Sequence, residues 1–207
     1  MPTKIVIVDF GMGNLNSVRL KIAKDKNAVV NISSDSKEIM TADKLILPGV
    51  GHFAKAMNNL KEFNLISALN EFVIIKKKPI LGICLGMQLM ANKSEEGGAS
   101  GFGWIDSDVV RFGVEDKLKY KIPHCGWNQI IKSKDSCLMN DIPELSEFYF
   151  VHSYHLVVKN HSDILNETEY ESKFTSAIEK GNIFGVQYHP EKSHDLGEVL
   201  LKNFINL

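Results

Sequence analysis

The segment from Pro79 to Met90 constrains the fold of this chain more than any other segment. Pro79–Ile83 is an uninterrupted apolar run, which predicts a buried parallel strand, and Leu85–Asn92 is predicted to be a helix. Cys84 stands at the junction, with a glycine two residues away on either side. The corner needs both glycines because a Cβ at either position would collide in so sharp a turn. The pattern therefore predicts a cysteine presented at the carboxyl end of a buried strand.

Two interpretations of Cys84 are open on this pattern alone. A thiol at the start of a helix feels the positive end of the helix dipole, which favours the nucleophilic thiolate. Free cysteine is also among the most buried residue types, so a structural role is the alternative. A nucleophile requires a base and an oxyanion hole, which the rest of the chain has to supply.

Length and charge exclude several classes of protein. The chain has 207 residues and a formal net charge of −1, and 44% of it is hydrophobic and 24% charged. We expect one domain over residues 1–207. The charge offers nothing to attract nucleic acid or an anionic membrane. Since no stretch approaches the ~20 apolar residues of a membrane span and no signal sequence is recognisable, we expect a cytoplasmic protein.

Strands and helices alternate along the first half of the chain. This alternation predicts an α/β fold, in which an open, mostly parallel sheet is flanked by helices in three layers and ligands bind at the carboxyl ends of the strands. The predicted strands before Pro79 are Lys4–Asp9, Val29–Ile32 and Lys44–Leu47, and the predicted helices are Asn16 or Ser17 to Lys24, His52–Leu60 and Leu65–Ile75.

After Asn92 the pattern changes to a polar loop, Ser94–Gly103, followed by short β-type runs. Their brevity and turn-rich spacing predict antiparallel strands that extend or flank the sheet. The chain closes with a predicted amphipathic helix, Leu196–Ile205. The short runs are Asp108–Phe112, Asn128–Ile131, Phe148–Val151, Leu156–Val158, Phe174–Ile178 and Ile183–Gln187.

Two glycine-containing turns follow predicted strands. Pro48–Gly51 offers backbone N–H groups that can turn toward a ligand, as an oxyanion hole requires, although a tight connection is an equal alternative. The turn Asp9–Asn14 lacks the third glycine of a dinucleotide fingerprint, so a surface turn is preferred there over phosphate binding.

His189 and Glu191 are the best candidates for a base and the group that orients it. Pro190 ends strand pairing, so both project from a rigid turn, and in an extended segment they face the same side. Imidazole suits proton transfer near neutrality, and a carboxylate behind it fixes the tautomer. His152 and His155 have a spacing seen in metal sites but are predicted to point to opposite faces of a strand. With three widely spaced cysteines and no completing carboxylate pair, we expect neither a disulfide framework nor a metal site.

These segments together resemble the class I (triad) glutamine amidotransferases, through Gly82–Gln88 and His189–Glu191. Further segments are similar to the glutaminase subunits of imidazole glycerol phosphate synthase, and the likeness covers nearly the whole chain. Departures from that pattern are mild and spare the triad: Phe10 for tyrosine, Cys125 for methionine and Tyr188 for phenylalanine. The further segments are Asp9–Leu15, Leu47–Gly51, Gly101–Trp104, Pro123–Asn128, Tyr149–Tyr154 and His189–Ser193.

The resemblance implies hydrolysis of L-glutamine to glutamate and ammonia without a cofactor. Cys84 would attack the side-chain carboxamide, His189 would shuttle the proton and Glu191 would orient His189. The backbone N–H groups of Val50 and Leu85 would form the oxyanion hole. The implied glutamine contacts are Gly49, Gly51, Gln88, Ser153 and Tyr154.

The resemblance also implies a heterodimer with a (β/α)8 synthase subunit that uses the ammonia in histidine biosynthesis. The positions implied at that interface are Asn14, Trp127, Tyr149 and Lys192, although core packing is the alternative for the two aromatic residues. The Val50 peptide is implied to switch the oxyanion hole when the partner binds. Other hypotheses are a glutaminase that feeds surface-sugar amidation, a stand-alone γ-glutamyl-type cysteine hydrolase, and a non-catalytic interaction module.

Overall fold

The computed structural model describes residues 2–207, in which helices pack around a 12-stranded sheet. The helices are α1 (Leu15–Ile22), α2 (Ser36–Thr41), α3 (Phe53–Glu62), α4 (Ile66–Asn70), α5 (Leu85–Gln88) and α6 (His194–Asn206), with a π-helical segment at Glu71–Ile75 and 3-10 turns at Cys137–Met139, His161–Asp163 and Pro190–Lys192. The strands are β1 (Thr3–Val8), β2 (Ala28–Ser33), β3 (Lys44–Gly49), β4 (Ile80–Cys84), β5 (Lys93–Ser94), β6 (Ala99–Ser100), β7 (Ser107–Arg111), β8 (His124–Gln129), β9 (Ile131–Lys132), β10 (Glu147–His152), β11 (Tyr154–Val158), β12 (Ile164–Tyr170), β13 (Ser172–Lys180) and β14 (Ile183–Val186).

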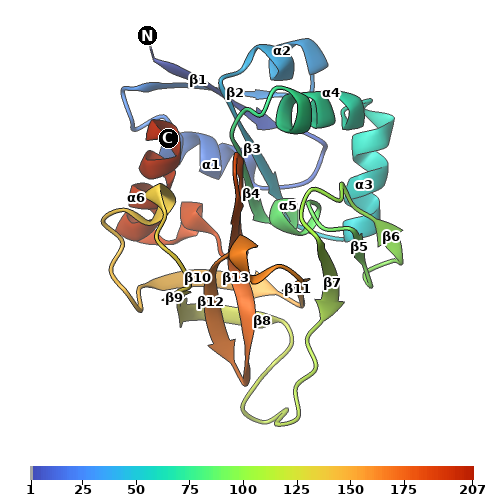
Figure 1. Ribbon diagram of the computed structural model, residues 1–207, viewed down its shortest axis with the longest axis vertical. Coiled ribbons are helices and arrows are strands. Elements are labelled where there is room, and N and C mark those ends of the chain that lie inside the picture. The colour runs from blue at the N-terminus through green and yellow to red at the C-terminus, as the bar shows by residue number, and fades with distance from the viewer. Residues whose placement is uncertain (1) are drawn as a thin grey trace.

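The centre of the sheet is parallel and is covered by helices on both faces. Strands β2, β1, β3, β4 and β14 lie side by side in that order, each parallel to its neighbour. Alternate side chains of β1 enter opposite layers, with Val6 and Val8 in one apolar cluster and Ile5 and Ile7 in the other. Figure 1 shows α1 and α6 on one side of these strands and α3 and α4 on the other. The predicted three-layer α/β fold is confirmed.

The second half of the chain adds antiparallel strands, as predicted. β13, β11 and β7 extend the sheet beyond β14, and β8 pairs with β10 in a separate two-stranded sheet. In Figure 1 these strands fill the lower half of the molecule. The prediction for Ile183–Gln187 is confirmed on one side and wrong on the other, because β14 is antiparallel to β13 but parallel to β4. This long-range insertion places the end of β14 directly beside Cys84.

The helix after Cys84 is shorter than predicted, since α5 ends at Gln88 instead of Asn92. The carbonyl groups that would continue the helix are used by the following loop. Phe102 N donates to Leu89 O at 2.8 Å, and Trp104 N donates to Met90 O at 2.9 Å. These bonds fold the loop back onto the nucleophile segment and end the helix early.

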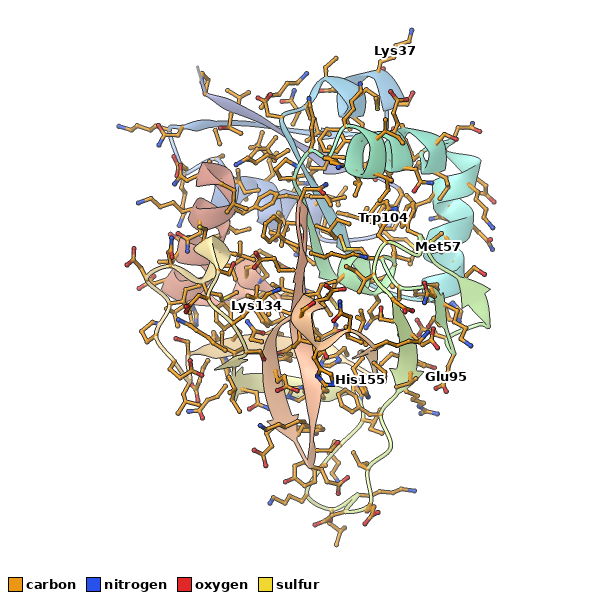
Figure 2. All side chains as sticks on the ribbon, viewed as in Figure 1. Lys37, Met57, Glu95, Trp104, Lys134 and His155 are labelled. Atoms are coloured by element: carbon orange, nitrogen blue, oxygen red, sulfur yellow. The ribbon has the colours of Figure 1, made fainter. Side chains whose placement is uncertain are left out.

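The predicted polar loop Ser94–Gly103 is more ordered than expected, because it contains β5 and β6. Trp104 anchors its far end: the ring is buried in the same apolar cluster as Met57, and its Nε1 donates to Asn70 Oδ1 at 2.8 Å. Figure 2 labels Trp104 and Met57 on the side of the sheet that carries α3 and α4. The loop is therefore packed against α3 and α4 and forms a fixed wall beside α5.

Several element boundaries differ from prediction because their determinants are tertiary. Helix α1 begins after Asn14, so neither Asn16 nor Ser17 is its cap. The predicted run Asn128–Ile131 is divided between β8 and β9, which pair with different strands. Helix α2 and strand β12 were not predicted at all.

No helix within residues 2–207 is long and apolar enough to cross a membrane.

Candidate active site

Cys84 occupies a strained corner between β4 and α5. Its φ of 54° and ψ of −111° are a conformation that residues other than glycine rarely adopt. A Cβ on Gly86 would lie 1.6 Å from Leu47 O, and one on Gly82 would lie 2.7 Å from Met87 N. The predicted need for glycine at both positions is confirmed. The close approach of α5 to β3 holds the thiol at the carboxyl edge of the sheet.

The pairing of β14 with β4 brings His189 to the same edge. Val186 is opposite Ile83 in this parallel pair, so the residues that follow β14 lie next to Cys84. Pro190–Lys192 forms a 3-10 turn, in agreement with the predicted rigid turn, although the segment is not extended. The turn still directs Glu191 toward the imidazole: Glu191 Oε1 lies 2.8 Å from His189 Nδ1, and both side chains are buried.

Ser193 fixes the backbone on which this histidine stands. Its Oγ donates to His189 O at 2.7 Å and accepts from Tyr149 N at 3.0 Å. The backbone N of His189 donates to Tyr149 O at 2.9 Å. Ser193 was not singled out from the sequence as a support for the candidate base, because its bond to Tyr149 joins segments that are far apart in the chain.

The imidazole of His189 is held in its protonated form. Burial disfavours the charged ring, but its interactions with Cys84 and Glu191 outweigh burial and raise the pKa of His189 to about 9. Within residues 2–207, His189 Nε2 is buried and makes no hydrogen bond. Glu191 occupies the other ring nitrogen, so Nε2 is the nitrogen available for exchange of a proton with the thiol or with a substrate.

A cavity of about 340 Å³ opens onto Cys84. Six of the seven predicted oxyanion and glutamine contacts line it, namely Val50, Gly51, Leu85, Gln88, Ser153 and Tyr154. Gly49 is instead buried at the end of β3, where it pairs with Cys84. The volume suits one small polar molecule.

Sequence reasoning missed Glu96, which also lines this cavity. It belongs to the predicted polar loop Ser94–Gly103, and one of its oxygens, Oε2, accepts from Phe53 N at 2.7 Å. A carboxylate fixed at the wall of the cavity provides a partner for a cationic group of a ligand.

Gln187 is a second residue that was not singled out. It is fully buried, and its Nε2 donates to Cys84 Sγ at 3.5 Å. Its Oε1 accepts from Gln88 Nε2 at 2.9 Å, and Gln88 Nε2 also donates to Tyr154 O at 2.9 Å. The two amides therefore connect the wall of the cavity to the sulfur.

Three of the four predicted interface residues contact one another beside the site. Trp127 is 44% exposed, which excludes the core-packing alternative for it, and its ring stacks on His194 with centroids 4.9 Å apart. Half-buried Tyr149 meets Trp127 edge to face at 6.0 Å, and Lys192 Nζ lies 5.5 Å from the Tyr149 ring centroid. Asn14 is exposed just before α1, which packs against the 3-10 turn that contains Lys192.

Two further histidines, His124 and His152, are buried in contact with each other beside the site. His124 Nδ1 lies 3.0 Å from His152 Nε2, and burial lowers the pKa of His124 to about 4 and that of His152 well below its ordinary value. His152 and His155 both pack against Phe112, at 5.2 and 4.5 Å between ring centroids, so the predicted placement on opposite faces was wrong. Within residues 2–207, no group of at least three histidine, cysteine or acidic side chains is arranged to hold a metal ion.

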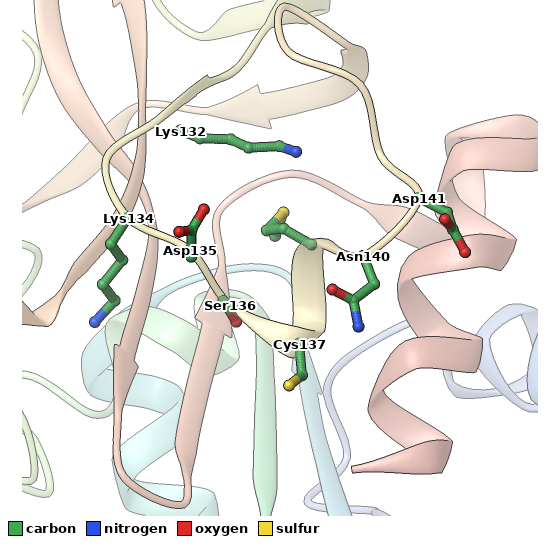
Figure 3. Close-up of a pocket in the computed structure, with 8 residues that line it drawn as sticks. Lys132, Lys134, Asp135, Ser136, Cys137, Asn140 and Asp141 are labelled. Atoms are coloured by element: carbon green, nitrogen blue, oxygen red, sulfur yellow. The ribbon is translucent and has the colours of Figure 1, made fainter.

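A larger hollow, of about 510 Å³, lies in the polar segment 132–141 and shares no residue with the cavity at Cys84 (Figure 3). One of its two lysines, Lys134, donates to Ser162 O and Glu179 O and is thereby used within the fold. The other side chains that line it provide no nucleophile with a base beside it. The cavity at Cys84 is thus the candidate active site.

Comparison with known proteins identifies the class to which this fold and site belong. The family model described as "Glutamine amidotransferase class-I" matches residues 6–207. Among solved structures, PurLQS from Thermotoga maritima shares the fold with a TM-score of 0.72 at 14% identity, covering 100% of this chain and 99% of that one. A structure described as a glutamine amidotransferase has a TM-score of 0.70 at 13% identity, covering 98% and 99%.

Curated relatives narrow the class. The "Imidazole glycerol phosphate synthase subunit HisH 2" of Methanococcus maripaludis is 50% identical, over 97% of this chain and 98% of the relative. The protein of the same description from Pseudomonas aeruginosa is 47% identical, over 98% and 99%. The chain therefore belongs to the class-I glutamine amidotransferases and, within them, to the family of imidazole glycerol phosphate synthase subunits named HisH.

Proposed function

We propose that this chain is the glutaminase subunit of an imidazole glycerol phosphate synthase. It hydrolyses L-glutamine to glutamate and ammonia, and a (β/α)8 synthase subunit uses the ammonia to make imidazole glycerol phosphate and aminoimidazole carboxamide ribonucleotide in histidine biosynthesis. The observation that carries the proposal is the burial of Cys84, His189 and Glu191 at one edge of the sheet, in a chain 50% identical to a HisH subunit.

The reaction begins when the Cys84 thiolate attacks the carbon of the glutamine carboxamide. The imidazolium of His189 then gives its Nε2 proton to the departing nitrogen, and ammonia leaves a γ-glutamyl thioester on the sulfur. His189, now neutral, takes a proton from water as the water attacks the thioester. Glutamate departs, and the thiolate and imidazolium are restored. Glu191 holds the ring through Nδ1 during the whole reaction. The 2.8 Å hydrogen bond between Glu191 Oε1 and His189 Nδ1, both buried, supports this role.

The oxyanion of each tetrahedral intermediate is assigned to the backbone N–H groups of Leu85 and Val50. Both residues line the cavity on either side of Cys84. Loss of one such donor typically costs about 3 kcal/mol, or a hundredfold in rate. The 42% exposure of Val50 supports a partner-dependent state of this peptide, since its side chain is open to contact by another subunit.

The amino-acid end of glutamine is assigned to the wall formed by Gln88, Glu96 and the Ser153–Tyr154 backbone, with Gly49 and Gly51 shaping the opposite loop. The Nε2 of Gln88 donates to Tyr154 O and Gln187 Oε1, so the side-chain oxygen of Gln88 is free to accept from the substrate ammonium. The carboxylate of Glu96 provides the opposite charge.

The synthase subunit is assigned to the surface that carries Asn14, Trp127, Tyr149 and Lys192. A large, exposed tryptophan bordered by polar side chains suits a protein interface. We place residues 1–207 in one domain, because the first and last strands of the chain belong to the same sheet. A cytoplasmic location fits a chain whose cysteines are all free.

The test is reconstitution with a (β/α)8 synthase subunit. Ammonia release from glutamine should increase on mixing and should vanish in Cys84→Ala, with Cys137→Ala as the matched control at a free, exposed cysteine. Undiminished release by Cys84→Ala would overturn the proposal. Full activity of the chain alone would instead support the stand-alone hydrolase, and failure to complement a histidine auxotroph would support a different ammonia acceptor. The curated relatives favour neither alternative.

A further inference from the structure

Gln187 lies in direct contact with the proposed nucleophile, although it was assigned no part in the reaction. The parallel register places it there: Val186, the last residue of β14, is opposite Ile83, so Gln187, which follows β14, stands beside Cys84. The side chain is fully buried, and its Nε2 is 3.5 Å from the sulfur. A buried amide in contact with a reactive thiol favours the thiolate if its N–H group faces the sulfur, and disfavours the thiolate if its oxygen does.

The backbone carbonyl of Tyr154 fixes which end that is. A carbonyl only accepts hydrogen bonds, so the group of Gln88 that lies 2.9 Å from Tyr154 O must be its Nε2. The same nitrogen lies 2.9 Å from Gln187 and donates to it, so Gln187 turns its oxygen toward Gln88. The Nε2 of Gln187 therefore faces Cys84 as a donor.

We infer that Gln187 is a further residue of the catalytic machinery, which stabilises the Cys84 thiolate by donating a hydrogen bond to the sulfur and is held in that orientation by Gln88. The inference rests on the proposed function, in that Cys84 is taken as the nucleophile. A thiolate accepts this hydrogen bond more strongly than a neutral thiol does. Polarisation along the two amides adds to the effect, because donation into the Gln187 carbonyl strengthens its own N–H as a donor.

The inference also separates the roles of the two glutamines. Gln88 reaches the cavity and contacts the proposed substrate, whereas Gln187 contacts the sulfur and is shielded from the cavity by burial. Loss of the Gln187 donor should therefore lower kcat with little change in KM. Loss of the Gln88 side chain should raise KM and lower kcat together, because it removes a substrate contact and frees Gln187 to turn.

The direct test is the rate at which iodoacetamide alkylates Cys84 as a function of pH, followed on the Cys84 peptide by mass spectrometry so that Cys125 and Cys137 do not contribute. Gln187→Met keeps the volume but has no donor. Its alkylation profile should move to higher pH by about one unit, which is about a tenfold loss of rate on the acidic limb of the profile. Its glutaminase kcat should fall by about the same factor and recover as the pH rises.

Gln187→Glu provides the second variant, because it keeps the shape and the oxygen that accepts from Gln88. It places a negative charge near the sulfur, so its profile should move further than that of Gln187→Met. The matched control is Gln129→Met, the same change at an exposed glutamine of β8, which should leave the profile unchanged.

Wild-type alkylation profiles in folded Gln187→Met and Gln187→Glu would overturn the inference, as would a loss of thermal stability with no movement of either profile. Neither result would affect the proposed function, which is tested separately by the glutaminase activity of Cys84→Ala in the complex. The alkylation readout does not depend on turnover, so the two failures are distinguishable.

Discussion

The carboxylate of Glu191 lies 2.8 Å from Nδ1 of His189, and both groups are buried at the carboxyl end of the sheet. The distance is that of a charge-assisted hydrogen bond, in which the carboxylate fixes the ring and favours its protonated form. A 3-10 turn with proline between the two residues makes the pair local and rigid. Cys84, by contrast, comes from a distant part of the chain, at the end of the neighbouring strand β4.

Glu191→Gln should lower glutaminase kcat by about a hundredfold or more, because a neutral amide does not stabilise the imidazolium and allows the wrong tautomer. The pKa of His189 should also fall, since Glu191 is one of the groups that raise it. Steady-state kinetics and NMR titration of the histidine measure the two effects. Glu179→Gln is the matched control: it also alters a carboxylate with a buried oxygen, on β13, and should leave both values unchanged.

Activity and stability should both decline on the alkaline side. The pKa of His189 is raised from 6.5 to about 9, so the folded protein holds this proton over a range in which the unfolded chain has lost it. Its contribution to stability is therefore complete below about pH 6.5 and disappears as the pH rises through about 9. The kcat profile should have an alkaline limb near pH 9, because ammonia requires an acid on departure. A limb near the ordinary histidine value would contradict the assignment.

Because the corner at Cys84 is strained, two variants that both lack the thiol should differ in stability. Cys84→Gly should be more stable than Cys84→Ala by about 1 kcal/mol, because glycine adopts a φ of 54° without steric cost. Both variants should lack glutaminase activity. Urea denaturation of the two proteins measures the difference, and a less stable Cys84→Gly would show that the corner carries no strain.

Gly86→Ala should unfold the protein or destabilise it by about 3 kcal/mol, since its Cβ would overlap the carbonyl oxygen of Leu47. Gly113→Ala is the control, because a Cβ at that glycine meets nothing within 4 Å. The urea midpoint of each variant measures the cost. Equal stability of the two variants would mean that α5 does not pack on β3 as closely as described.

Lys44 should be a major contributor to stability through the end of α6. Its buried ammonium donates to Phe204 O, Ile205 O and Leu207 O at 2.9, 2.7 and 2.8 Å, which satisfies carbonyls at the helix terminus. Lys44→Met should cost about 2 kcal/mol in urea denaturation, because those carbonyls lose their donor. Lys37→Met, at the exposed lysine labelled in Figure 2, should be close to neutral.

The corner at Cys84 was predictable because its determinants are local. An apolar run, a cysteine and two glycines within a few residues specify a strand, a sharp turn and a helix. The collision at Gly82 is with Gly86 and Met87 of the same corner, whereas the collision at Gly86 is with Leu47 of β3 and is not local. The histidine turn was predictable for the same reason, since Pro190 ends a strand wherever that strand lies. In both cases the residue pattern determines the chemistry before the fold is known.

The remaining features depend on contacts that no local pattern contains. Strand β12 was missed because Asn166 and Thr168 make it polar, yet both are buried and bonded to Ser176 of β13. Gln187 lay inside a predicted strand, but only the pairing of β14 with β4 turns it toward the sulfur. Glu96 and Ser193 likewise acquire their positions from partners far along the chain.

The most direct test of the central claim is the identity of the residue that carries the glutamyl group during turnover. The chain and its (β/α)8 partner are mixed with glutamine, quenched in acid within the first turnovers, and mapped by peptide mass spectrometry. We expect a glutamyl thioester on Cys84, and we expect both the thioester and ammonia release to be absent in Cys84→Ala. A glutamyl group recovered on another residue, or undiminished turnover by Cys84→Ala, would contradict that claim.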